Sequence, residues 1–258
     1  MAKVFVLGHR GMLGHVVARV FEADGYQVCV SDVRFDGELA GGLLEQVRRS
    51  GCEVVVNCIG TTPERADART MLLVNALLPQ ALAAFGTGSL LIHASSDGVF
   101  SGRAGGYRIG QAPDAEDPYG LSKRLGDLCV ELGRVVVFRT SIVGPDSKAR
   151  SLVSWYLAQR DPVQGFVDQR WNGITSLSWA RCALRAARGE FSLGVHHLAC
   201  AEPLSKARLL MAIREAFGAG PEVAPTASGN PLDRTLEPTC RLADIQKQLE
   251  ELFDWYRR

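Results

Sequence analysis

The stretch KVFVLGHRGMLGHVVARVFEADG, residues 3–25, decides the fold. It begins with a short apolar run that ends at Gly8, continues through a turn with glycines at positions 8, 11 and 14, and goes on with apolar residues at helical spacing. This order predicts a strand, a glycine-rich turn and a helix. Glycines in such a turn let backbone amides approach a pyrophosphate at the amino terminus of the helix. The segment therefore predicts a dinucleotide-binding turn.

Strand-like and helix-like segments alternate after this turn. The strands are expected at YQVCVSD (26–32), EVVVNCIG (53–60), SLLIHASS (89–96) and RVVVFRTSIVG (134–144), and the helices at 39–51, at 75–86 and from Tyr119 onward. Uninterrupted apolar strands indicate a parallel sheet that is covered by helices on both faces. The fold class is therefore α/β, with a Rossmann-type doubly wound parallel sheet and a small C-terminal substrate-binding lobe.

The last third of the chain is less regular. Helices are expected at 151–160 and 175–190, a strand at GVHHLAC (194–200), and an amphipathic helix at 242–258. We expect residues 1–144 to form the dinucleotide-binding domain. Residues 145–258 are expected to form mostly the substrate-binding lobe, with about 173–200 returning to the first domain.

Composition excludes several classes of protein. The 258 residues include 29 basic and 28 acidic side chains, for a net charge of +1, so no general attraction to nucleic acid or to an anionic membrane is expected. No apolar run approaches the length of a membrane span, and the apolar stretch at the amino terminus is too short for a signal sequence. Seven cysteines without a C-x-x-C pair indicate reduced thiols, and the histidine spacing predicts no metal site. The expected compartment is the cytoplasm.

Two readings of the coenzyme remain open. Asp32, at the end of the second strand, could accept both ribose hydroxyls of NAD. Arg10 and Arg34 could instead converge on the 2′-phosphate of NADP, because guanidinium groups bind phosphate in a bidentate manner. NADP is preferred and NAD is the alternative. The coenzyme-binding turn comprises Gly8, Arg10, Gly11, Met12, Leu13 and Gly14.

A possible catalytic pair lies in EDPYGLSKRLGD, residues 116–127. Tyr119 and Lys123 are four residues apart on a predicted helix, so they share one face. Ser95 and Ser96 follow the strand whose carboxyl end should form the ligand crevice. A serine hydroxyl and Tyr119 could share a ketone oxygen, while Lys123 would lower the pKa of the tyrosine and assist proton transfer.

At these residues the chain resembles the extended short-chain dehydrogenase/reductases, most closely the dTDP-4-dehydrorhamnose reductase branch. The resemblance rests on the glycine turn, on VVVNCIG, VNALLPQALA, SSDGVF, PYGLSK and FRTSIVGP, and on TSLSWA followed by GVHHLA. The segment GHRGM is also similar to the corresponding segment of GDP-fucose synthases, in which the arginine at the position of Arg10 helps to hold the NADP phosphate. The resemblance implies that Ser96 is the hydroxyl partner, that Tyr119 is the acid, and that Lys123 adjusts the pKa of Tyr119. Tyr119 and Lys123 would also contact the coenzyme, together with Asn57, Cys58, Ile59, Gly60 and Asn75.

The resemblance implies NAD(P)H-dependent reduction of a nucleotide-linked keto-sugar of the dTDP-4-keto-6-deoxyhexose type, and a homodimer is a family-level expectation. The alternatives are a nucleotide-sugar epimerase with the same triad and a non-catalytic NADP-binding regulatory subunit. Asp97 is followed by Gly98 rather than by a second acid, so elimination of water is not expected. Related reductases carry a tyrosine where Gly98 stands, so the sugar is not fixed by the resemblance. The candidate substrate-binding residues are Ser96, Asp97, Arg139, Trp155, Trp171 and Asn172.

Overall fold

A computed structural model describes residues 1–39, 42–85, 88–146 and 149–257. Its main element is a sheet of six strands, and every neighbouring pair in that sheet is parallel. The strand order reverses on the two sides of the first strand, as in a doubly wound fold. In spatial order the strands are β10 (Gly194–His197), β5 (Val135–Arg139), β4 (Leu90–Ala94), β3 (Val54–Asn57), β1 (Lys3–Leu7) and β2 (Gln27–Val30).

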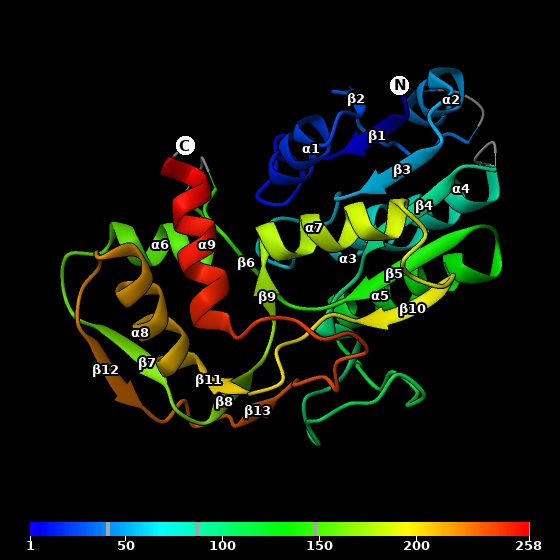
Figure 1. Ribbon diagram of the computed structural model, residues 1–258. Coiled ribbons are helices and arrows are strands. Elements are labelled where there is room, and N and C mark those ends of the chain that lie inside the picture. The colour runs from blue at the N-terminus through cyan, green and yellow to red at the C-terminus, as the bar shows by residue number, and fades with distance from the viewer. Residues whose placement is uncertain (40–41, 86–87, 147–148, 258) are drawn as a thin grey trace.

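Successive side chains along the strands point alternately to the two faces of this sheet, and both faces are covered by helices. In β1, Val4 and Val6 face the core that contains α1 (Gly14–Ala23) and α7 (Ser176–Ala187). Phe5 and Leu7 face a second core that contains α2 (Gly42–Ser50) and α4 (Leu78–Phe85). Successive side chains of a strand point to opposite faces, so a strand buried on both faces must be apolar throughout. The predicted α/β fold class is confirmed (Figure 1).

A smaller lobe lies beside the carboxyl edge of the sheet (Figure 1). Within it, α8 packs against β7 and β12, while α9 packs against both α8 and α7 and so connects the lobe to the main sheet. Its elements are α6 (Leu152–Ala158), β7 (Val163–Phe166), β8 (Gln169–Trp171), β11 (Leu204–Ser205), α8 (Lys206–Phe217), β12 (Val223–Thr226), β13 (Leu232–Asp233) and α9 (Ile245–Arg257).

Most of the expected segments are present, with three differences. The expected single strand 134–144 is wrong: it breaks after β5, and its end forms β6 (Ile142–Val143), which leaves the sheet to pair with β9 (Ile174–Thr175). Helix α8 was not expected, although Ser205 caps its amino terminus and Gly218 ends it in the left-handed conformation. The short strands of the lobe were also not expected. Residues 40–41, 86 and 258 of the predicted helices lie outside the described residues.

Helix α5 (Pro118–Asp127) begins and ends at identifiable contacts. Pro118 occupies its first turn, and the Asp117 carboxylate accepts a hydrogen bond from the Gly120 backbone amide at 3.0 Å. At its other end, the Arg139 guanidinium donates from Nε to Asp127 Oδ2 at 2.7 Å, and both side chains are buried. This ion pair fixes α5 to the carboxyl end of β5.

One helical stretch of the described chain, Ala68–Phe85, has the length and apolar composition of a membrane span. This corrects the sequence reading, in which no apolar run came close to that length. The stretch joins α3 (Ala68–Met71), the π-helix η1 (Leu72–Leu77) and α4, and 39% of it is buried. It packs against α5, as a core helix of an α/β protein would.

We predict that Arg139→Met lowers the free energy of unfolding by about 3–5 kcal/mol, because it leaves the Asp127 carboxylate buried without its partner. The measurement is urea denaturation at pH 7. Arg188→Met, which breaks the more exposed pair between Arg188 and Asp24, is the control and should cost less than about 1 kcal/mol. Equal losses in the two variants would contradict this account of α5.

Candidate active site

A cleft of about 360 Å³ opens at the point where the strand order reverses. Its walls come from the turn after β1 and from the segments after β3, β4 and β6, together with α5. Open α/β sheets bind ligands in this crevice at the carboxyl ends of the strands. The residues that line it are Arg10, Gly11, Met12, Leu13, Cys58, Ile59, Gly60, Thr61, Thr62, Arg65, Ala94, Ser95, Ser96, Tyr119, Lys123, Thr140, Ser141, Ile142, Asp146, Arg150 and Ser151.

The glycine turn forms one wall of the cleft. The Gly11 amide donates to Gly8 O at 2.8 Å, which closes the turn. A Cβ atom on Gly14 would lie 2.1 Å from Gly8 O, so only glycine allows α1 to start this close to β1. Leu13 provides no side-chain cap for α1, and no acidic residue lies in its first turn. The amino terminus of α1 therefore presents free amides and a positive dipole end to the cleft, which fits a phosphate group.

Two of the three residues proposed to select the coenzyme, Arg10 and Asp32, contact each other at the edge of this wall. Arg10 Nη2 donates to Asp32 Oδ2 at 2.6 Å, and His9 Nε2 lies 3.6 Å from Asp32 Oδ1. Arg10 lines the cleft, whereas Asp32 and Arg34 are exposed beyond its lining. In the sequence, Asp32 favours NAD and Arg10 favours NADP, but in the structure the two side chains form one ion pair.

Two buried asparagines hold the segment that follows β3. Asn57 Oδ1 accepts from the Ile59 amide at 3.1 Å, and its amide nitrogen donates to Nδ1 of His93 at 3.2 Å. Asn75 accepts from the Thr61 amide and donates to Thr61 O, each at 2.9 Å. Neither asparagine lines the cleft; both shape the backbone that does.

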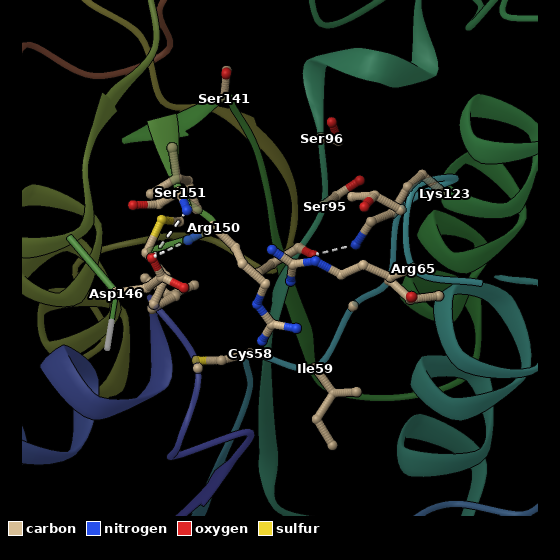
Figure 2. A pocket seen from close by; sticks show the side chains of 18 of the residues that line it. Cys58, Ile59, Arg65, Ser95, Ser96, Lys123, Ser141, Asp146, Arg150 and Ser151 are labelled. Carbon is tan, nitrogen blue, oxygen red and sulfur yellow. Dashed lines mark hydrogen bonds between the residues drawn. The ribbon is translucent and has the colours of Figure 1, made fainter. Parts of the chain in front are cut away.

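Ser96, Tyr119 and Lys123 meet on the wall opposite the glycine turn, where Figure 2 shows Ser96 and Lys123. The Lys123 ammonium is buried and donates to Ala94 O at 2.9 Å, which places it under the end of β4. The hydroxyl of Ser96 accepts from the Gly98 amide at 2.9 Å, and its interaction with Tyr119 lowers the pKa of that phenol. The three residues that the sequence pattern joined therefore line the same cleft.

Burial sets the charge states of this group. It raises the pKa of Tyr119 to about 12, which the hydrogen bond with Ser96 opposes, so Tyr119 is a protonated phenol at pH 7. Burial lowers the pKa of Lys123 to about 8, which the nearby Asp127 carboxylate opposes. Burial lowers the pKa of His93 well below its usual value, so this imidazole is neutral and its Nδ1 can accept from Asn57. The site therefore holds a proton donor beside a cation.

Gly98 leaves room for the tyrosine ring. A Cβ atom at this position would lie 2.8 Å from Cε1 of Tyr119 and 3.1 Å from the Ser96 hydroxyl. Any side chain here requires the ring or the backbone to shift. The observed position of the Tyr119 ring therefore depends on glycine at position 98, where related reductases carry a tyrosine.

Five of the six candidate substrate residues are absent from the lining of this cleft, and four of them have positions that correct the sequence prediction. Arg139 is buried in the ion pair with Asp127, and Trp171 is buried in the hydrophobic core. Asn172 is buried and bonds to Cys200 O, to Leu236 O and to the Leu236 amide, so it holds loops together. Trp155 is 41% exposed on α6 and is not among the lining residues.

The other two candidates remain at the site. Ser96 lines the cleft, and Asp97 lies directly behind it, where the Ser96 hydroxyl donates to Asp97 Oδ1 at 3.2 Å. Burial raises the pKa of Asp97, while Arg234 and Lys206 of the smaller lobe lower it. Asp97 therefore interacts both with Ser96 and with charges on the smaller lobe.

Several lining residues were missed in the sequence. They lie at or after the carboxyl ends of β3, β4 and β5 or lead into α6, so the rule that ligands bind at these ends could have identified them. Asp146 Oδ1 accepts from the Arg150 and Ser151 amides at 2.8 and 2.9 Å, which turns this segment toward the cleft (Figure 2). The missed residues are Thr61, Thr62, Arg65, Ala94, Thr140, Ser141, Ile142, Asp146, Arg150 and Ser151. In the described part of the chain, no three His, Cys, Asp or Glu side chains are placed to hold a metal ion.

Comparisons with known proteins agree with this geometry. The chain is 29% identical over 248 residues to a dTDP-4-dehydrorhamnose reductase of Burkholderia thailandensis, covering 87% of this chain and 82% of the relative. Its fold is similar to that of a dTDP-4-dehydrorhamnose reductase from Clostridium acetobutylicum, with a TM-score of 0.85, 20% identity and coverage of 99% and 100% of the two chains. The corresponding enzyme of Bacillus anthracis, in complex with NADP, gives a TM-score of 0.82, 17% identity and the same coverage. The family model for the RmlD substrate binding domain matches residues 2–255, and the chain belongs to this family.

Proposed function

We propose that this protein reduces a nucleotide-linked keto-sugar, of the dTDP-4-keto-6-deoxyhexose type, to the alcohol at the expense of NAD(P)H. The observation that carries the proposal is the meeting of Ser96, Tyr119 and Lys123 on one wall of a cleft whose opposite wall is a glycine turn at a helix amino terminus. The reductase names of the curated relative and of the structural neighbours support the same reaction.

The coenzyme would lie along the glycine turn. Met12 and Leu13 offer backbone amides, and the segment Cys58–Gly60, held by Asn57 and Asn75, forms the facing side. NADP is the first choice and NAD the alternative. Arg10 and Arg34 would bind the NADP 2′-phosphate, whereas Asp32 would accept from the ribose hydroxyls of NAD. Because Arg10 already pairs with Asp32, binding of NADP would require Arg10 to exchange a carboxylate for a phosphate.

Proton transfer falls to Tyr119. When bound, the reduced nicotinamide supplies a hydride to the carbonyl carbon of the sugar. The hydroxyls of Ser96 and Tyr119 would donate hydrogen bonds to the carbonyl oxygen, and Tyr119 would transfer its proton to that oxygen as its charge grows. The high pKa of Tyr119 suits this direction, because the phenol holds a proton to give at pH 7.

Lys123 would stabilise the tyrosinate that remains after this transfer. Its ammonium is buried near Tyr119, one helical turn along α5, where an uncompensated negative charge would be costly. Asp127, a further turn along, favours the charged form of Lys123. The three side chains therefore lie along one face of α5 as donor, cation and counter-ion.

For the division of the chain, we propose that residues 1–144 and about 173–200 form the coenzyme-binding domain. The rest of 145–258 forms the substrate-binding lobe. The pairing of β10 with β5 and the packing of α7 on α1 support this division.

The first prediction for this function is that the protein oxidises NADPH in the presence of enzymatically generated dTDP-4-keto-6-deoxyhexoses. Loss of reduced-nicotinamide absorbance, recorded separately with NADPH and NADH, measures the activity and ranks the coenzymes. Tyr119→Phe should lower kcat by about 100-fold or more while coenzyme affinity stays the same, because only the proton donor is removed.

The alternative functions give different results in the same assay. An epimerase would convert the sugar without net consumption of NADPH, and a regulatory subunit would bind NADPH without turnover. Full activity of Tyr119→Phe would contradict the role given to this residue.

A second prediction concerns pH. Because the pKa of Lys123 is about 8, its ammonium is present below that pH and is lost as pH rises. The value of kcat/KM for NADPH should therefore fall above about pH 8, by up to tenfold per pH unit. Lys123→Met should show weaker coenzyme binding and no such fall. The same pH profile in wild type and variant would rule out Lys123 as the titrating group.

We also propose that the protein forms a homodimer in the cytoplasm. Apolar side chains are more than a third exposed along α5 and the helices packed beside it, and a second copy would cover them. They are Leu72, Leu77, Phe85, Leu121, Leu125, Leu128 and Leu132. The seven free thiols are compatible with a reducing compartment.

Light scattering tests the proposed dimer. The wild type should have twice the mass of one chain, and Leu125→Glu should halve it. Leu193→Glu, on another exposed leucine, should leave it unchanged. A monomeric wild type would overturn the proposal.

A further inference from the structure

Five charged side chains line the cleft, and three of them have partners. They are Arg10, Arg65, Lys123, Asp146 and Arg150. Arg10 pairs with Asp32, Lys123 donates to Ala94 O, and Asp146 accepts from two backbone amides. The cleft therefore contains four cations and one carboxylate, and the charges of Arg65 and Arg150 need a separate explanation.

Arg65 and Arg150 reach into the cleft from opposite sides. Arg65 follows β3, in a turn closed by its own amide donating to Thr62 O at 2.9 Å. Arg150 precedes α6, where its amide is held by Asp146. Figure 2 shows the two side chains extending toward the middle of the cleft. In the described ranges, neither guanidinium makes an ion pair or a side-chain hydrogen bond to another protein group.

Two guanidinium groups that converge without a counter-ion repel each other. The amino terminus of α1, between Gly11 and Gly14, adds a further positive dipole end to the same cleft. Positive groups thus surround the cleft from three segments of the chain. A ligand with two adjacent negative charges would relieve this repulsion, and guanidinium groups match phosphate oxygens with two parallel hydrogen bonds.

We propose that Arg65 and Arg150 form an arginine clasp that binds a diphosphate across the cleft. The proposal rests on the proposed function in one respect: the coenzyme and the nucleotide-sugar each carry a diphosphate, and either could occupy the clasp. The clasp joins the turn after β3 to the segment before α6, so it would tie the ligand to both walls.

Charge-removing variants test the clasp. Arg65→Gln, Arg150→Gln and the double variant are compared with the wild type, and Arg69→Gln is the control, since Arg69 is an exposed arginine of α3 outside the lining. Dissociation constants are measured by calorimetric titration of NADPH, ADP-ribose, AMP and dTDP. Each single variant should weaken binding of the clasped diphosphate about tenfold. The double variant should lose less than the product of the two, because both arginines bind one group.

The ligands distinguish the two sources of the diphosphate. Weaker binding of NADPH and ADP-ribose, with AMP unchanged, assigns the clasp to the coenzyme. Weaker binding of dTDP alone assigns it to the nucleotide-sugar. If neither class of ligand binds the variants more weakly than it binds Arg69→Gln, the clasp is wrong even where wild-type binding supports the proposed function.

Inorganic pyrophosphate and ligand-free stability provide readouts that do not depend on the proposed function. Pyrophosphate should raise the Tm of the wild type and of Arg69→Gln, and should raise that of the double variant much less. Without ligand, the double variant should be at least as stable as the wild type, because removing either charge relieves repulsion. A lower ligand-free Tm, or equal stabilisation by pyrophosphate in all variants, would overturn the clasp in favour of a structural role.

Discussion

The buried charges of Lys123, Asp127 and Arg139 constrain the rest of the site. Lys123 donates to the end of β4, and Asp127 pairs with Arg139 at the end of β5, so α5 is fixed to two neighbouring strands. Charges are buried at an acceptable cost only when they are paired in a suitable geometry. A rotation or shift of α5 would leave these charges without partners. The helix therefore has one favourable position, which places Tyr119 at the cleft beside Ser96.

The same burial divides the chemistry between neighbouring side chains. An apolar environment raises the pKa of a phenol and lowers that of an ammonium group, so Tyr119 keeps its proton while the pKa of Lys123 falls to about 8. On the opposite wall, the glycine turn offers unpaired amides in place of side chains. One wall thus suits proton transfer and the other suits phosphate binding. This separation allows a coenzyme and a ketone to share one cleft.

Features of the structure that depend on residues close together in the sequence could be predicted, whereas features that depend on contacts between distant residues could not. The glycine turn and the strands of the large sheet rest on local apolar patterns and backbone sterics, and they appear in the structure as expected except that the segment 134–144 breaks after β5. The lobe depends on strands of two to four residues whose partners lie far along the chain, and a short segment carries little pattern of its own. Arg139 illustrates the limit for single residues: it lies at the end of a strand, as a ligand-binding residue would, but a carboxylate twelve positions away holds it in the core.

The sequence by itself determined the α/β class, the glycine turn before the first helix, and the spacing that puts Tyr119 and Lys123 on one helical face, because each depends on residues close together in the chain. Only the tertiary structure decided which other side chains reach the cleft. It buried Trp171 and Asn172, paired Arg10 with Asp32, and brought Arg65 and Arg150 to opposite sides of one cavity. The physical reason is that a side chain's surroundings are set by segments distant in sequence, and these meet only when the sheet, the helices and the smaller lobe pack together.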